Sequence, residues 1–99
     1  MKVRNMTNAK GRAIPNQFII TDDHGFEFFQ SYETIIVKRY ATGFLNRDGY
    51  PEPVIYLDRD AWNYSRTTSK YRNWFLGETT KETKRKIADG TYKLVDLNN

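Results

Sequence analysis

The stretch QFIITDDHGFEFFQSYETIIVKRY, residues 17–40, decides the fold. Two runs rich in β-branched and aromatic residues flank Asp22-Asp23-His24-Gly25, a sequence typical of a hairpin loop, so residues 17–30 predict a β-hairpin. The β-branched run at residues 34–37 disfavours a helix and predicts a third strand over residues 31–40. This part of the chain is therefore expected to build an antiparallel sheet from neighbouring strands.

Both faces of the predicted hairpin carry apolar side chains. One face receives Phe18, Ile20, Phe26 and Phe28. Ile19 and Phe29 fall on the other face, because side chains alternate along a strand. A domain with two short helices covers little more than one face of its sheet, so we expect Ile19 and Phe29 to form an exposed apolar patch. Such patches mark partner sites, and this one predicts a homodimer or a complex with a host protein.

The sequence after residue 40 predicts a loop, a strand, two helices and a last strand. The loop covers residues 41–53, where Asp48-Gly49 is a turn signal, and a short strand follows at residues 54–58. Tyr71, Trp74 and Phe75 have the spacing of one helical face, which predicts a core-facing stripe on a helix over residues 66–76. Thr67, Thr68 or Ser69 is expected to cap its start. Residues 79–82, TTKE, match a capping box that starts a second helix.

The last strand is expected at residues 91–97, paired with an early strand. The order of elements predicts an α+β fold: a mostly antiparallel, twisted sheet of about five strands, with two short helices in the C-terminal half and a final strand. Residues 1–99 are expected to form a single domain, within which residues 1–14 are a candidate for a flexible basic segment.

Charge and composition narrow the function classes. The chain of 99 residues has no cysteine, which excludes disulfides, thiolate metal sites and a cysteine nucleophile. No apolar run is long enough to span a membrane, and the N-terminus lacks the apolar core of a secretory signal. The net charge is +4, and residues 61–86 alone carry +5. Such a basic region attracts polyanions.

Three stretches carry a resemblance to known proteins: QFIITDDHGFEFFQSYETIIV, AWNYSRTTSKYRNWFLGETTKETKRKI and GTYKLVDLN. They resemble a group of small proteins encoded by bacteriophages and prophages of Gram-positive bacteria, catalogued as a domain of unknown function. WNYSRTTSKYRNWFLGE is the specific part. The resemblance implies a phage protein acting in the bacterial cytoplasm, where handling nucleic acid and disabling a host system are common tasks. It implies no catalytic residue.

No pattern of catalytic or metal-ligating residues is evident. The single histidine, His24, lies in the predicted hairpin loop, where turn chemistry explains it better than a metal or acid–base site. Asp58 and Asp60 could hold Mg²⁺, but their place after a strand favours capping of a turn. The phosphate-loop, dinucleotide, zinc-protease and serine-hydrolase motifs are all missing from the sequence. We therefore expect a protein without catalytic activity, cofactor or metal.

The basic region predicts nucleic-acid binding, mainly to phosphates. Its candidate contacts are Arg66, Lys70, Arg72, Lys81, Lys84, Arg85 and Lys86. Trp62 is a further candidate for contact with a partner, because it lies outside the helical stripe. DNA and RNA both fit this hypothesis. The alternative is a phage inhibitor of a host protein or of a nucleoprotein defence complex such as CRISPR, which would act by protein–protein binding.

Overall fold

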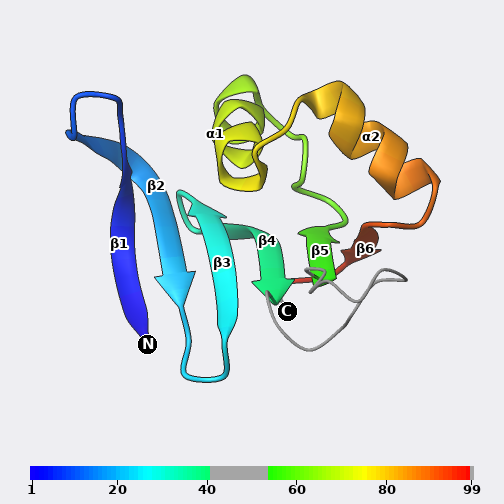
Figure 1. Ribbon diagram of the computed structural model, residues 1–99, viewed down its shortest axis with the longest axis horizontal. Helices are drawn as coiled ribbons and strands as arrows, with labels where there is room; N and C mark the ends of the chain where they lie inside the picture. The colour runs from blue at the N-terminus through cyan, green and yellow to red at the C-terminus, as the bar shows by residue number, and fades with distance from the viewer. Residues whose placement is uncertain (41–53, 99) are drawn as a thin grey trace, which may run out of the picture.

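Six strands form one sheet whose spatial order follows the sequence, β1-β2-β3-β4-β5-β6, in the computed structural model, which describes residues 1–40 and 54–98 (Figure 1). The strands are β1 (Lys2–Thr7), β2 (Ala13–Thr21), β3 (Phe26–Ser31), β4 (Thr34–Tyr40), β5 (Val54–Asp58) and β6 (Lys93–Val95). The helices α1 (Arg66–Leu76) and α2 (Thr80–Ala88) lie between β5 and β6. This confirms the predicted α+β class, and the predicted loop at residues 41–53 lies outside the described residues.

The structure of the first 14 residues and the pairing of the last strand both differ from the predictions. Residues 1–14, expected to be a flexible segment, hold β1 and the start of β2, and β1 is an edge strand with Lys2 and Arg4 along it. Charged edge strands are common because they oppose pairing with other chains. The last strand, β6, does not pair with an early strand but lies parallel to β5. The two helices carry the chain back, so β6 runs in the same direction as β5.

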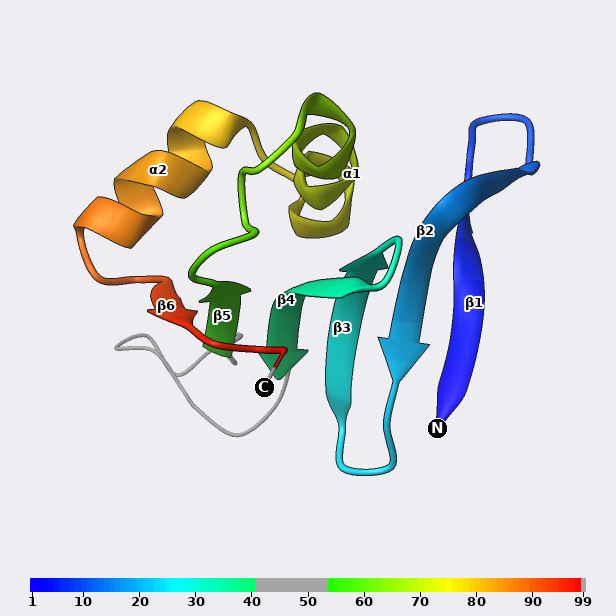
Figure 2. The same ribbon diagram turned by 180° about the vertical axis from the view of Figure 1, so that it is seen from behind.

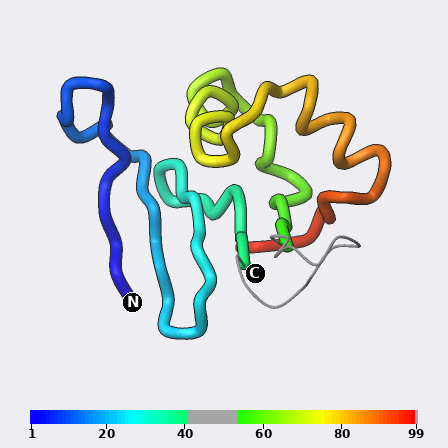
Figure 3. Tube along the Cα trace, viewed as in Figure 1, coloured from blue at the N-terminus to red at the C-terminus, as the bar shows by residue number. Residues whose placement is uncertain are grey.

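Both helices lie on the same side of the sheet (Figures 1 and 2). Helix α1 lies against β3 and β4, whereas α2 lies near the β6 edge, far from β1. The path in Figure 3 runs strand by strand from β1 to β4, and then returns from β5 through the helices to β6. The sheet therefore has a helix-covered face and a second face, called the open face, that neither helix covers.

The face of the hairpin predicted to be exposed is the one that the helices cover. Phe29 has no exposed surface, and its ring stacks on that of Phe75 in α1 with centroids 5.9 Å apart. Ile19 packs beside it against the core. In the strand register Phe29 lies between Ile19 and Val37. Ile19, Phe29 and Val37 therefore form a continuous row of core side chains across β2, β3 and β4. The prediction that Ile19 and Phe29 form an exposed patch is wrong.

Helix α1 is turned about its axis relative to the predicted orientation. Its buried residues are Thr68, Arg72 and Phe75, whereas Trp74 is 50% exposed. The prediction that Phe75 faces the core is confirmed, and the prediction for Trp74 is wrong. Ser65, rather than a residue of the 67–69 run, caps the helix by accepting a hydrogen bond from the Thr68 backbone.

A glycine ends α1, and the predicted capping box begins α2. Gly77 follows α1 with φ of 71°, in the left-handed conformation that glycine adopts without strain. Thr79 and Glu82 form the predicted capping box at the start of α2, each side chain bonded to the backbone of the other residue. The turn between the helices is therefore defined locally by the sequence.

Candidate nucleic-acid interface

The outward face of α1 carries two cations and an indole. Arg66, Lys70 and Trp74 are four residues apart in turn, so they share one side of the helix, and all three are exposed. The Lys70 Nζ lies 5.7 Å from the centroid of the Trp74 ring. Tyr71 meets the Trp74 ring edge to face, with centroids 5.3 Å apart. Because α1 contains no acidic residue, this side of the helix is purely basic and aromatic.

Helix α2 adds three exposed cations. They are Lys81, Lys84 and Arg85. The one acidic residue within α2 is Glu82, and its carboxylate accepts hydrogen bonds from Thr79 in the capping box. Little apolar surface of α2 is available to contact the rest of the protein, and the three cations are exposed to water. Together with Arg66 and Lys70 they are called the helix cations below.

Arg72 is not part of this surface. Its side chain is completely buried, and its guanidinium donates hydrogen bonds to the Trp62 carbonyl and to Thr80 Oγ1. It also donates to the side chains of Asn63 and Asn73, at 3.1 and 3.0 Å. Burial lowers the pKa of this guanidinium, while the negative charge of Glu78 opposes the shift. The prediction that Arg72 contacts nucleic acid is wrong, because this residue points into the protein.

Lys86 is half-buried and engaged within the protein. Its Nζ lies 2.8 Å from Glu78 Oε1, and this hydrogen bond raises the pKa of Lys86. Burial opposes ionisation of Glu78, but the bonds from Lys86, Thr83 and Tyr92 outweigh it and lower the pKa of Glu78. Burial, together with the Glu78 carboxylate, raises the pKa of Tyr92 to about 12. Lys86 therefore anchors the C-terminal half of α2, so it is a poor candidate for a phosphate contact.

Trp62, a candidate for partner contact, is half-buried and packs against the core. Its ring lies 5.2 Å from the Arg72 guanidinium, and its carbonyl accepts a hydrogen bond from that group. Together with Ile19 and Phe29, Trp62 belongs to the packing between sheet and helices. The structure therefore brings none of the three predicted partner residues onto a common exposed surface.

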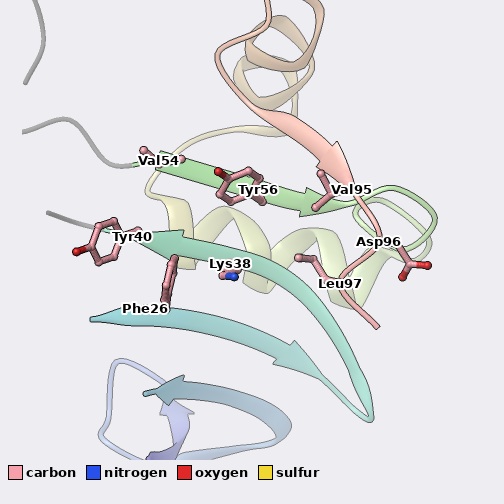
Figure 4. A pocket seen from close by; sticks show the side chains of 8 residues that line it. All are labelled: Phe26, Lys38, Tyr40, Val54, Tyr56, Val95, Asp96 and Leu97. Atoms are coloured by element: carbon pink, nitrogen blue, oxygen red, sulfur yellow. The ribbon is translucent and has the colours of Figure 1, made fainter. Parts of the chain in front are cut away.

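A groove on the open face was not predicted. It has a volume of about 460 Å³. Its lining residues are Phe26, Lys38, Tyr40, Val54, Tyr56, Val95, Asp96 and Leu97 (Figure 4). In Figure 4 α1 lies behind the strands, on the far side of the sheet from the groove, and α2 lies beyond the β6 edge. The charge of Lys38 alone does not identify this face, because its neighbour Arg39 lies on the covered face and donates a hydrogen bond to the Phe75 carbonyl of α1.

Of the two acidic residues considered as Mg²⁺ ligands, Asp58 is engaged in a turn, whereas the exposed Asp60 carboxylate lies 3.9 Å from Arg59 Nε. The Asp58 side chain is buried and accepts from the backbone of Asp60 and Ala61. The backbone groups of His24 and Phe26 donate to Asp22 Oδ1, which confirms the turn reading of this loop. Within residues 1–40 and 54–98, no three acidic or histidine side chains are placed to hold a metal ion. Over the same residues, no helix has the length and apolarity to cross a membrane.

Comparison with known proteins gives a family but no activity. No curated protein and no solved structure is significantly similar to the chain. A family model matches residues 1–90, which is most of the sequence, and it includes β1 to β5 and both helices. The match confirms the expectation of a domain of unknown function: the chain belongs to DUF8033, a family of unknown function.

Proposed function

We propose that the protein binds nucleic acid through the outward faces of α1 and α2 and catalyses no reaction. The observation that carries this proposal is the exposed stripe of Arg66, Lys70 and Trp74. Cations bind phosphates, and exposed aromatic rings stack on unpaired bases, so the stripe offers both kinds of contact. Contacts mainly to phosphates give affinity with little preference for sequence.

The proposal includes a cellular context. The resemblance of three stretches of the sequence to small phage and prophage proteins of Gram-positive bacteria supports a phage protein that acts in the host cytoplasm. Nucleic acid is a polyanion present there, and the helix cations are the basic surface that would meet it. An anti-defence role would use the same surface to displace the nucleic acid of a host nucleoprotein complex.

The test measures affinity for a labelled oligonucleotide of about 20 nucleotides, single-stranded or duplex, as salt rises from about 50 mM. Engagement of about four phosphates predicts a slope of roughly −3 to −4 in a plot of log affinity against log salt on duplex DNA. The variant K81E/K84E/R85E should lose binding and keep its fold, because all three side chains are exposed.

A matched control distinguishes specific binding by the helix cations from attraction by the net charge of the protein. The variant K2E/R4E/K10E makes the same change in net charge, but it lies on and beside β1, at the far edge of the sheet from α2. This control should keep most of the affinity at moderate salt. Equal losses in the two variants, or no binding by the natural chain at about 50 mM salt, would overturn the proposal.

A further inference from the structure

The groove on the open face combines aromatic rings with one cation. Two rows of cross-strand neighbours run over this face: Phe28, Lys38 and Tyr56, and Phe26, Tyr40 and Val54. The Lys38 Nζ lies 4.2 Å from the centroid of the Phe26 ring, which also contacts Tyr40 with centroids 4.7 Å apart. The lysine is therefore held among rings in the middle of the sheet rather than extended into water.

One wall of the groove comes from the C-terminal segment, which is fixed by hydrogen bonds. The Leu97 backbone donates to Asp58 Oδ1 at 2.9 Å. The Asn98 side chain bonds both backbone groups of Ile35, donating to the carbonyl at 3.0 Å and accepting from the amide at 2.8 Å. Figure 4 shows Leu97 opposite Phe26, with Lys38 between them. The site is therefore a built groove with two walls and a charged floor.

The position of Lys38 limits what this groove binds. No carboxylate of the described residues forms an ion pair with Lys38, and a dry apolar partner would bury its charge at a cost. A second copy docked through the same face would bring like charges together. Asp96 accepts from the Asn98 backbone, and its carboxylate points away from the centre of the groove in Figure 4. The charge of Lys38 therefore favours an anionic ligand.

We propose that the groove binds one unpaired nucleotide of a single strand, with its base against Tyr40 and Tyr56 and a phosphate on Lys38. The volume of about 460 Å³ falls within the usual range for small-molecule sites. Aromatic side chains on an open sheet are a common platform for unpaired bases, and paired bases inside a duplex are not available to stack on them. The rings and Lys38 call for a ligand with an aromatic group and an anionic group. We choose a nucleotide from this class because of the proposed function, on which this inference rests.

The experiment uses the full ¹⁵N-labelled chain and two probes, a single-stranded oligothymidine of about ten nucleotides and a duplex of equal length. We expect the single strand to shift the backbone amides of residues 38–40, 54–56 and 95–97, and the duplex to leave them unchanged. The groove shifts should persist in K81E/K84E/R85E, because these three residues belong to α2 and none of them lines the groove. Tyr40→Leu should weaken single-strand binding about tenfold.

Lys38 provides the sharper control. Lys38→Gln should remove the groove shifts, and Lys38→Arg should restore them, with all variants first shown to keep a folded amide spectrum. Absence of groove shifts with the single strand overturns this inference, whatever happens at the helices. Absence of any binding at the helices overturns the proposed function instead. Groove shifts that depend on protein concentration without DNA would identify a second copy as the occupant, and would also overturn the inference.

Discussion

The buried Arg72 guanidinium donates a hydrogen bond of 2.9 Å to the Oγ1 of Thr80, the first residue of α2. The same group binds the Trp62 carbonyl, so one cation joins the turn before α1, the helix itself and the start of α2. At the other end of α2, Lys86 is held by Glu78. Polar contacts therefore connect both ends of α2 to the rest of the protein. Its cations Lys81, Lys84 and Arg85 lie on the exposed side of the helix.

Arg72→Met is expected to destabilise the protein by about 3 kcal/mol, because it removes every hydrogen bond that this buried guanidinium donates and leaves the Trp62 carbonyl without this donor. The free energy of unfolding in urea measures this effect. Arg66→Met is the matched control on the exposed side of the same helix, and should change stability by no more than about 0.5 kcal/mol. An Arg72→Met protein of normal stability that fails to bind nucleic acid would place Arg72 at the interface.

Trp74→Ala and Phe75→Ala separate the two sides of α1. Phe75 is buried against Phe29, so its truncation should cost about 3–4 kcal/mol of stability. Trp74 is half-exposed, so its truncation should cost about 1 kcal/mol or less and should weaken single-strand binding about fivefold or more. Thermal melting and fluorescence anisotropy give the two readouts. Loss of several kcal/mol in Trp74→Ala would show that the indole is a core residue.

Much of the fold follows from local sequence signals. The hairpin, the strand at residues 54–58, both helices and the capping box were predicted because each depends on residues close together in the chain. The pairing of β6 with β5 was not, because it depends on the path through two helices. Local chemistry therefore predicts the elements better than it predicts their pairing.

The candidate site was predicted only in part, because burial depends on contacts far along the chain. The hairpin has apolar side chains on both faces, and only the register of Phe29 with Val37 shows which face is covered. Arg72 falls inside a basic region, and its burial depends on acceptors supplied by Trp62 and Thr80. Lys38 and Arg39 are adjacent cations of β4 that point to opposite faces, so their charge did not indicate which face the helices cover.

Acid is expected to weaken the attachment of α2 through Glu78. The side chain is 3% exposed, and its hydrogen bonds outweigh burial to hold its folded pKa below the ordinary 4.5. A carboxylate with a lowered folded pKa contributes stability above the unfolded pKa, and this is lost as pH falls through the folded value. Glu78→Gln should cost about 2 kcal/mol near neutral pH and remove this component of acid sensitivity. The free energy of unfolding in urea, measured from pH 6 to pH 2, gives both the cost of Glu78→Gln and the loss of stability in acid. If this free energy falls equally with pH in the natural chain and in Glu78→Gln, Glu78 is not the group responsible.

High pH is expected to lower the stability of the protein through Tyr92, whose phenol donates a hydrogen bond to Glu78. Its folded pKa is raised from 10.0 to about 12, by burial first and then by the Glu78 carboxylate. A raised folded pKa means that the neutral phenol contributes stability that is fully present below pH 10 and is lost as pH rises through about 12. Tyr92→Phe should lower stability at neutral pH and flatten the profile above pH 10. An unchanged alkaline profile would show that another group titrates there.

The position of the C-terminal segment should depend on Asp58. This side chain is buried and accepts four hydrogen bonds. Its donors are the backbones of Asp60, Ala61 and Leu97 and the side chain of Asn98. Asp58→Ala leaves the buried donors unpaired and should cost about 3 kcal/mol. Asn98→Ala removes only the exposed end of this network, so it should cost about 1 kcal/mol, speed hydrogen exchange at the Leu97 amide and weaken single-strand binding at the groove. Unchanged exchange at Leu97 in Asn98→Ala would show that the wall of the groove is held without Asn98.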